Sequence, residues 1–510
     1  MKKKHKQITF NKSLVLLMLS LSIGLSNNIE MNGAINSNYG SSYDFYNFSE
    51  NLLDLNFFYN NLQGWVQYEY SNPPDIGFVT NDIRKFRLEY SIDNFLIKVG
   101  DLYEFWGRGL LLNQFDDQVT NFDNGARGMY LEYYNYPFTF SHLNGNADIW
   151  APSADREPNA KNIHNIVANR FQYEWNSLLF GVTQLRSNED HQKQNGPNVN
   201  VAHNLKGAYA SWSGNNADFF MEYVDKISTE QTSSFGTSPN DTLKRGHGFY
   251  QNINFYLGNW GLSTEYKRFS FDKSHSGLTA DDYGNQIEFQ QMPTLGKEHN
   301  STLLGRVTHN YDFNNERGVQ FELNGSLFGL SVSAQYAHLS KNHTWKSIRK
   351  FEWVDSALDN YLPSSDISAL PYWENYQEIS GYVFNDKLYF KIGRGENKEV
   401  KEVFRYIETW QRDVKEDGYF IYDTTYFDFD PDSLNPYIDS VGFPIYSDPY
   451  KVKSRKYTQL KAFTIPLEVN YILNNGYTIG IGFQYQEREA YNREMGNATG
   501  FVSSSDSTLE

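Results

Sequence analysis

The chain has 510 residues, a formal net charge of −16 at pH 7 and no cysteine. The missing cysteines exclude disulfides and thiol chemistry, and the acidic surplus argues against nucleic acid as a partner because like charges repel. Tyr and Phe are abundant, at 38 and 37 residues, while the mean hydropathy is low. This combination fits a membrane β-barrel, in which only alternate strand residues face lipid.

The first 26 residues have the layout of a secretory signal peptide. Four lysines near the start precede an apolar run from Leu14 to Leu25, and the small residue Ser26 follows. The run is too short to cross a bilayer as a helix, and no later run of 18 residues is apolar. We expect a signal peptide at 1–26, a barrel over 27–490, and a polar tail or the start of a truncated extracellular loop over 491–510. An uncleaved membrane anchor at the N-terminus is the alternative.

Strands are indicated by alternation of apolar and polar residues. Phe86, Leu88, Tyr90 and Ile92 alternate with polar neighbours, and the same pattern returns over 319–323, 330–336 and 477–485. Short turns alternate with long polar connections, as in a barrel whose two ends face different compartments. The predicted strands are 31–39, 50–59, 62–71, 84–92, 95–102, 128–135, 138–145, 165–175, 178–187, 204–213, 217–227, 247–257, 260–271, 285–293, 301–310, 318–326, 330–340, 376–384, 387–394, 457–473 and 477–489.

The predicted fold is all-β: a large antiparallel transmembrane β-barrel with short periplasmic turns and long extracellular loops. Single-chain bacterial barrels have an even number of strands, so the 21 readable strands predict about 22, with either a missing C-terminal strand or a count that is off by one. Alternation alone would also fit a soluble β-sandwich. Within the longest connection, 396–455, the residues from Val400 to Val414 fit either a short amphipathic helix or an extended strand.

The stretch from Gly100 to Leu112 joins the end of a predicted strand to a long loop. Two glycines flank Arg108 and permit a bend. We expect residues 103–127 to fold inward as a pore constriction, because charged side chains at a narrowing select ions and polar solutes. The candidate constriction residues are Glu104, Arg108, Asp116, Asp117 and Asp123. Alternatively, Glu104 and Arg108 pair with each other and only brace the strand end.

The same stretch carries a family resemblance. Gly100-Asp101-Leu102-Tyr103-Glu104, followed by Gly107-Arg108-Gly109-Leu110, resembles a motif of an uncharacterised domain family of Bacteroidota outer-membrane barrels. The resemblance implies a barrel fold and an outer-membrane location. It implies no activity.

Other candidate sites are less specific. Asp428, Asp430 and Asp432 space oxygens as calcium loops do, but the turn glycine and the distal Glu of such loops are missing, so an acidic, solvated loop is the alternative. A second group consists of aromatic residues that could stack on sugar rings: Trp353, Tyr361, Tyr372 and Trp373. Packing of these rings against one another explains them equally well. No Gly-x-Ser-x-Gly motif occurs, so we expect no catalytic site, no enzyme activity and no required cofactor.

The sequence therefore predicts a porin-like channel that lies in the outer-membrane lipid and passes a polar small solute. A non-conducting surface barrel whose acidic, aromatic loops bind a partner or a glycan is the alternative. A barrel enzyme such as a lipid hydrolase is a third hypothesis. Nothing in the sequence indicates the oligomeric state.

Overall fold

The structure is a computed structural model. The residues that it describes are 29–42, 46–75, 79–118, 122–150, 161–191, 199–231, 242–271, 289–290, 292–306, 309, 311–312, 315–349, 352–358, 360–413, 420–423, 450–473, 476–495, 501–502 and 507–509. The predicted signal peptide at 1–26 lies outside these residues.

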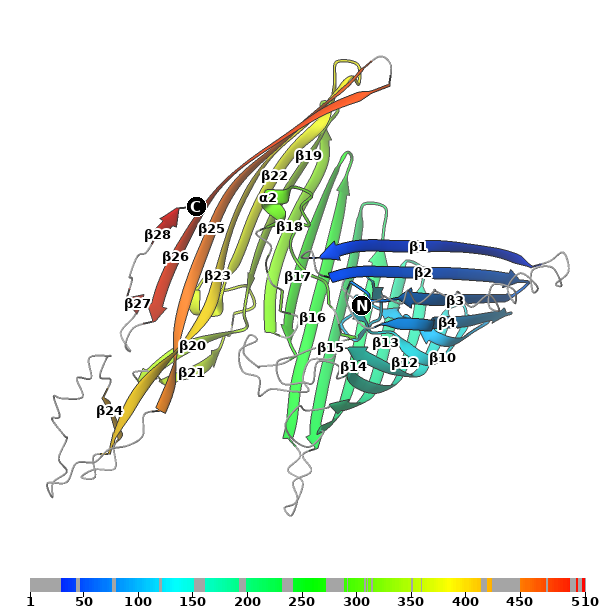
Figure 1. Ribbon diagram of the computed structural model, residues 1–510, viewed down its shortest axis with the longest axis horizontal. Coiled ribbons are helices and arrows are strands. Elements are labelled where there is room, and N and C mark those ends of the chain that lie inside the picture. Colours follow the sequence, from blue (N-terminus) through cyan, green and yellow to red (C-terminus); the bar gives the residue numbers. More distant parts are fainter. Residues whose placement is uncertain are drawn as a thin grey trace, which may run out of the picture. The chain divides into compact units, whose positions relative to one another are not determined.

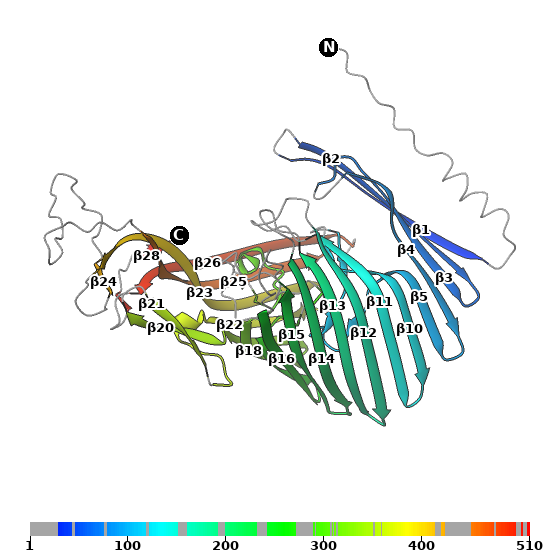
Figure 2. The ribbon, with the colours of Figure 1, turned by 90° about the horizontal axis from the view of Figure 1, so that it is seen from below.

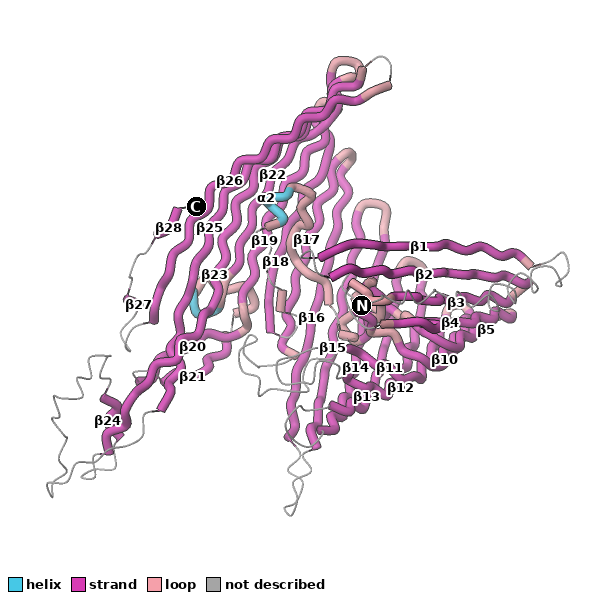
Figure 3. Tube along the Cα trace, in the orientation of Figure 1, coloured by secondary structure: helices cyan, strands magenta, loops and turns pink. Residues whose placement is uncertain are grey.

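Nearly all described residues belong to antiparallel strands (Figure 3). Within those residues, the helices are the one-turn α2, Thr302–Gly305, and the 3-10 turn η1, Ile367–Ala369. No helix in the described part of the chain is long and apolar enough to span a membrane. The predicted large, all-β, antiparallel fold is confirmed.

The chain divides into two compact units. The first comprises residues 1–208, 226–244 and 287–291, and the second comprises residues 209–225, 245–286 and 292–510. Three strands contribute residues to both units: β14 (Val199–Ser213), β15 (Ala217–Gln231) and β16 (Thr242–Leu257).

The first unit is an antiparallel meander in which neighbours in sequence are neighbours in the sheet (Figure 2). Its long strands are β1 (Glu30–Ser42), β2 (Tyr46–Tyr59), β3 (Leu62–Ser71), β4 (Thr80–Ile92), β5 (Phe95–Leu102), β10 (Ala126–Asn135), β11 (Phe138–Trp150), β12 (Lys161–Trp175) and β13 (Leu178–His191). Four two-residue strands lie between β5 and β10: β6 (Phe105–Trp106), β7 (Leu112–Asn113), β8 (Asp116–Asp117) and β9 (Phe122–Asp123).

The second unit is a meander of the same kind, running from β16 to β26 (Figure 1). Its strands after β16 are β17 (Trp260–Ser270), β18 (Asn315–Leu327), β19 (Leu330–Ser340), β22 (Tyr372–Val383), β23 (Leu388–Asp413), β25 (Tyr450–Ile472) and β26 (Thr478–Met495). The hairpin of β20 (His343–Arg349) and β21 (Glu352–Ala357) stands apart, β24 (Phe420–Asp423) pairs with β23, and β27 (Phe501–Val502) and β28 (Ser507–Leu509) pair with β26.

In both units, one face of the sheet exposes apolar side chains and the other carries polar ones. In the first unit, the cross-strand partners Phe140 and Phe171 are 40% and 41% exposed, whereas Ser141, the next residue after Phe140, is fully buried. In the second, Ile481 and Phe483 are 70% and 59% exposed. Side chains alternate between faces along a strand, so the period-two sequence pattern produces this division directly. We call the two surfaces the apolar face and the polar face.

Two of the predicted strands, 285–293 and 301–310, are wrong for those of their residues that the structure describes. Strand β17 pairs directly with β18, and the described residues between them form α2 and irregular backbone. Leu295 and Leu304 are nearly inaccessible, at 0% and 4% exposure. The apolar residues of this segment are therefore buried as in a packed loop. Short apolar runs do not distinguish that arrangement from a strand.

The two alternatives for residues 400–414 are also resolved for the described part, residues 400–413. Strand β23 continues to Asp413 and pairs with β25 as far as Thr409. The helix is wrong and the extended strand is confirmed. The cross-strand partner supplies the backbone hydrogen bonds that an isolated segment would have to form within itself.

Candidate functional site

The predicted constriction loop begins at a tightly packed glycine. Gly100 has φ +116°, and a Cβ there would lie 2.2 Å from the carbonyl oxygen of Phe86. The Asp101 carboxylate accepts hydrogen bonds from the Phe86 amide at 2.8 Å and from Arg127 Nε at 3.0 Å. The Gly100-Asp101 pair therefore ends β5 and ties its end to β4 and β10.

A short hairpin follows, formed by β6 and β7. Gly107 and Gly109 have φ values of +61° and +84°, which residues with a Cβ rarely adopt. The Gly109 amide donates to the Trp106 carbonyl at 3.0 Å, and Arg108 is exposed between the two glycines. The Gly107-Arg108-Gly109 sequence is thus the turn of the hairpin, with Arg108 at its tip.

The hairpin packs on the polar face of the first unit. Trp106 is 1% exposed and lies 5.3 Å from the Arg170 guanidinium. Arg170 is the cross-strand partner of Ser141 and donates a hydrogen bond to its hydroxyl. Both side chains lie on the polar face. The Leu110 carbonyl accepts from Gln290 Nε2 at 2.6 Å. The loop therefore folds over the polar surface of the sheet.

Hydrogen bonds donated by backbone amides hold the loop closed on itself. The Gln114 backbone N–H donates to the Glu104 backbone carbonyl at 3.0 Å, and the Phe115 backbone N–H donates to Asn124 Oδ1 at 2.6 Å. Lys98 of β5 forms an ion pair with the Glu104 carboxylate at 2.8 Å. The loop is consequently a fixed element with defined positions for its charged groups.

A cluster of opposite charges lies where the loop returns to the sheet. Lys85 Nζ lies 2.5 Å from an Asp116 oxygen and 3.0 Å from an Asp123 oxygen, and Arg84 lies 3.0 Å from Asp116. The β3–β4 register shifts at Gln67, so Arg84 is an extra residue beside Lys85. Such a bulge changes the direction of the side chains, and here Arg84 and Lys85 both contact the Asp116 carboxylate. We call Arg84, Lys85, Asp116 and Asp123 the loop-root cluster.

An aromatic ring and a cavity complete the loop-root cluster. The Tyr103 hydroxyl donates to Asp123 Oδ1 at 3.2 Å, and Lys85 Nζ lies 4.9 Å from the Tyr103 ring. Burial, and then the negative charges of Asp123 and Asp116, raise the pKa of Tyr103 far above its usual value, so its hydroxyl stays a donor. The cavity has a volume of about 390 Å³ and is lined by Arg84, Lys85, Asp101, Asp123, Gly125, Arg127, Asn146 and Asp148.

The second unit carries a covering segment of its own, residues 292–312. The Ser301 hydroxyl and the Leu303 amide both donate to Gln484 Oε1 at 2.9 Å. Gln484 lies between the exposed Phe483 and Tyr485 in β26. The segment therefore lies on the polar face of this unit.

His309 is the central contact of that segment. Its Nε2 lies 2.9 Å from Glu316 Oε2 and its Nδ1 lies 3.2 Å from Glu399 Oε1. Burial alone would lower the pKa of His309, but hydrogen bonds to both carboxylates and their charges raise it above its usual value. Because both ring nitrogens face acceptors, the doubly protonated imidazolium satisfies this site.

Comparison with known proteins places the chain in a family. A model described as "Family of unknown function (DUF6029)" matches residues 11–413. The chain belongs to this DUF6029 family. The prediction that the chain belongs to an uncharacterised family is confirmed. The Bacteroidota origin and the link between the motif and the family stay predictions. The comparison with curated proteins gives no match.

Several solved structures from Pseudomonas aeruginosa resemble this DUF6029 chain at low identity. OccK8 (OprE) is 9% identical, with 73% of this chain and 93% of that chain covered and a TM-score of 0.37. The outer membrane protein opdK is 12% identical over 73% and 92%, with a TM-score of 0.34. OccK2 (OpdF), solved in complex with glucuronate, is 11% identical over 73% and 91%, with a TM-score of 0.36.

The five predicted constriction residues occupy different places. Asp116 and Asp123 are cross-strand partners in the loop-root cluster, and Asp117 lies opposite Phe122 in the same small sheet. Glu104 pairs with Lys98, and Arg108 is exposed at the hairpin tip. Sequence reasoning missed Arg84, Tyr103 and the role of Lys85. The adjacent Arg84-Lys85 pair at the start of the predicted strand 84–92 was the available signal.

The remaining predicted sites are dispersed or lie outside the described residues. Tyr372 is 3% exposed on the polar face, whereas its neighbour Trp373 points to the other face, and Tyr361 is 75% exposed in a loop. The structure describes no side chain for Trp353. The possible calcium ligands Asp428, Asp430 and Asp432 lie outside the described residues, and within those residues no group of three or more acidic or histidine side chains could hold a metal.

Proposed function

We propose that the protein is an outer-membrane β-barrel channel that passes polar small solutes. One observation carries this proposal. The strands expose apolar side chains on one face, and a folded loop bearing charged residues covers the opposite, polar face. A water-soluble antiparallel sheet buries its apolar face and exposes its polar one, which is the reverse arrangement.

The exposed apolar face supports a lipid environment. In strand β26, Ile479, Ile481 and Phe483 are all more than half exposed. Exposed apolar surface of this extent is unfavourable in water and matches the lipid-facing band of an outer-membrane barrel. Closed sheets satisfy every backbone hydrogen bond within lipid, which agrees with the predominance of strands in the described residues.

The loop-root cluster supports passage of a polar solute. Lys85 pairs with Asp116 and Asp123, and Arg84 pairs with Asp116, at 2.5–3.0 Å, beside a cavity of about 390 Å³. Fixed charges of both signs at a narrowing favour hydrated ions and polar molecules over apolar ones. The charges would thus act as a filter, and the loop as its support.

Conductance of the purified protein in planar bilayers tests the proposal. We expect steady openings, and larger ones when residues 105–113 are replaced by a short Gly-Ser linker that removes the hairpin. Membrane fractionation of both proteins provides the control for correct insertion. A barrel that inserts but stays electrically silent in both forms would support the non-conducting surface protein instead.

A further inference from the structure

Residues 358 and 360–364, between β21 and β22, cross the apolar face of the second unit, and we call them the outer strap. The Tyr266 hydroxyl of β17 donates to the Tyr361 carbonyl at 2.9 Å. The Ser364 backbone N–H donates to Ser340 Oγ of β19 at 2.9 Å. Strand β18 lies between these two strands in the sheet. The outer strap therefore spans three adjacent strands.

The side chains that the outer strap contacts lie on the apolar face. Tyr266 is two residues from Thr264, whose cross-strand partner Phe321 is 47% exposed. Ser340 is four residues from Tyr336, which is 36% exposed and pairs with Phe321 on its other side. Residues two or four apart along a strand share a face. The outer strap therefore lies outside the sheet, unlike the covering segment of this unit.

Arg317 of β18 anchors the outer strap. Its side chain is fully buried, although Arg317 is the cross-strand partner of Ser340 on this face. Arg317 Nη2 donates to the Leu358 carbonyl at 3.1 Å, and Nη1 donates to the Asn360 carbonyl. Nε donates to Asn342 Oδ1 at 3.0 Å. A buried guanidinium is costly unless its N–H groups have acceptors. The outer strap supplies two of these acceptors, so the strap and the guanidinium hold each other in place.

Two apolar side chains of the outer strap stay exposed. Tyr361 and Leu362 are 75% and 64% exposed, although the backbone on either side of them is anchored. The Arg268 guanidinium lies 5.9 Å from the Tyr361 ring. These side chains extend the exposed apolar surface of β17–β19 and are not isolated on a polar surface. A continuous exposed apolar surface marks a contact with another phase or molecule.

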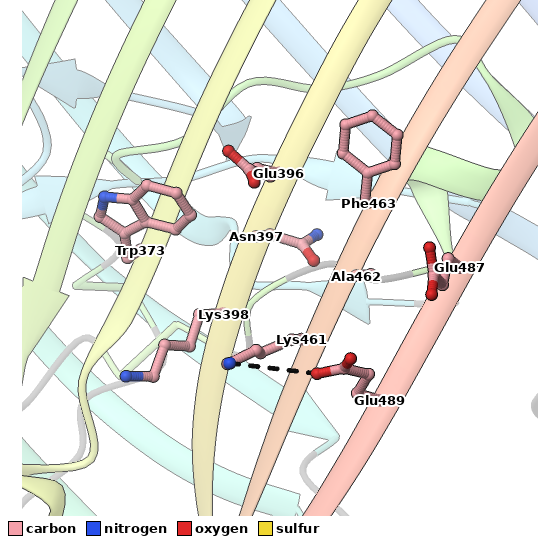
Figure 4. Close-up of a pocket in the computed structure, with 9 residues that line it drawn as sticks. All are labelled: Trp373, Glu396, Asn397, Lys398, Lys461, Ala462, Phe463, Glu487 and Glu489. Atoms are coloured by element: carbon pink, nitrogen blue, oxygen red, sulfur yellow. Dashed lines mark ion pairs between the residues drawn. The ribbon is translucent and has the colours of Figure 1, made fainter. Parts of the chain in front are cut away.

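One cross-strand row of the apolar face links the outer strap to aromatic and charged side chains. The Trp373 ring in this row lies 6.4 Å from the Tyr336 ring. Figure 4 shows Trp373, Lys398 and Lys461 around one cavity on this face. Aromatic rings beside charged groups are typical of the headgroup depth of a membrane. The row contains Tyr266, Val319, His338, Trp373, Lys398 and Lys461.

We propose that the outer strap is a membrane anchor, with Tyr361 and Leu362 inserted into the adjacent leaflet at the boundary between headgroups and acyl chains. The backbone sets this depth. Irregular backbone does not face the hydrocarbon core, because lipid offers no hydrogen-bond partners there. Tyrosine rings prefer the interface, where one end is apolar and the other is wet. The inference rests on the outer-membrane placement proposed above.

Lipid fits the outer strap better than a second copy of the chain. A stable protein interface buries about 800 Å² on each partner, and two exposed side chains supply far less than that. The surrounding apolar face is covered by lipid in the proposed barrel. The same lipid therefore reaches the strap without any further contact.

Nitroxide labels on the protein in liposomes measure the depth of the outer strap. The chain has no cysteine, so Leu362→Cys gives a single labelling site. Ile481→Cys, at a position 70% exposed on the apolar face, is the lipid reference. Lys387→Cys, in the exposed β22–β23 turn, is the water reference. Oxygen concentrates in lipid and nickel ethylenediaminediacetate in water.

We expect the ratio of oxygen to nickel collision rates at the Leu362→Cys label to lie between the ratios at the two references. A ratio equal to that of the water reference would overturn the proposal. This measurement leaves every anchoring contact of the outer strap in place.

Release of the outer strap is a second test. Arg317→Met removes the donors to Leu358 and Asn360 and keeps an apolar side chain, so the label should move to the ratio of the water reference. Arg394→Met is the matched control, because the Arg394 side chain is 58% exposed on the same face; the ratio should not change. Far-UV circular dichroism checks folding. An unchanged ratio in folded Arg317→Met would overturn the anchoring role of Arg317, and the depth in the Leu362→Cys protein decides if this variant does not fold.

Spin–spin broadening separates lipid from a second copy. Broadening at the Leu362→Cys label that disappears on dilution with unlabelled chain would assign the outer strap to an interface between copies and overturn the lipid proposal. A lipid-like ratio at Ile481→Cys with a water-like ratio at Leu362→Cys would refute the anchor alone. A water-like ratio at both would refute the membrane placement as well. A lipid-inserted strap in an electrically silent barrel would refute only the channel.

Discussion

Loop 103–125 of the first unit and segment 292–312 of the second both lie on the polar face of their own unit, but different chemistry holds them. The first is anchored by the buried Trp106 and by Lys85 between two aspartates. The second is anchored by glutamine side chains and by His309 between two glutamates. Histidine is the side chain that ordinarily changes charge between pH 5 and 8. The comparison therefore predicts a permanent cover in one unit and a pH-sensitive one in the other.

Removal of the hydrophobic anchor should have the largest effect. Trp106→Ala deletes a ring that is 1% exposed, and truncation of a buried aromatic side chain costs about 3–5 kcal/mol. We expect the hairpin to detach, with faster hydrogen exchange over residues 105–113 and larger single-channel conductance. Phe105→Ala is the matched control, since the neighbouring Phe105 is 53% exposed. Identical conductance in the two variants would mean that Trp106 does not hold the loop.

Removal of the Lys85 ammonium group should have the second-largest effect. Lys85→Met leaves the Asp116 and Asp123 carboxylates without their shared partner, at a cost of about 2 kcal/mol after allowance for the partial exposure of Asp123. The local charge becomes more negative, so the reversal potential in a salt gradient should shift toward cation selectivity. Adding Asp116→Asn should reverse most of that shift. A selectivity unaffected by Lys85→Met would place the loop-root cluster away from the ion path.

The His309 contact should show the predicted pH dependence. The folded-state pKa of His309 is raised, so the stabilisation is complete below the usual histidine pKa of about 6.5 and is lost as the pH rises through the raised value. The charged and titratable groups around this contact are Glu316, Glu399, Lys267, Asp312, Lys341, Lys401, Tyr311, Tyr372 and Glu374.

Hydrogen exchange of residues 299–312 between pH 5 and 9, corrected for intrinsic rates, measures this effect. Protection should fall with rising pH in the unaltered protein and should depend much less on pH in His309→Gln. The hairpin at 105–113 is the internal control, because its protection should stay level over the same range. Equal pH dependence in the two regions would remove the distinction between them.

The smallest effect is expected at the hairpin tip. Arg108→Ala removes an exposed charge while the buried part of the hairpin is kept. We expect a cation-directed shift of the reversal potential that is smaller than that of Lys85→Met, because an exposed charge is screened by salt. Arg394→Ala, on the apolar face of β23, should leave selectivity unchanged. No shift in Arg108→Ala would favour a bracing role for this stretch.

Alternation within the sequence was sufficient to predict most of the strands. Phe86 to Ile92 and Tyr477 to Tyr485 show period-two patterns because successive side chains of a strand point to opposite faces of the sheet. The same local signal failed for 285–293 and 301–310, where apolar residues such as Phe289 and Leu304 are buried by packing and not by strand pairing. It also left residues 400–414 open, because a strand there depends on a partner some 50 residues away in sequence.

By itself, the sequence determined the all-β class, the two faces of the sheet and the place where the long loop begins. It identified Gly107 and Gly109 as a possible bend, since that prediction needs only the backbone freedom of glycine. Only the tertiary structure decided that the loop lies on the polar face. That placement depends on contacts between residues far apart in the chain, such as Gln290 with Leu110 and Lys85 with Asp123. A local sequence pattern does not specify which distant residue a loop side chain will contact.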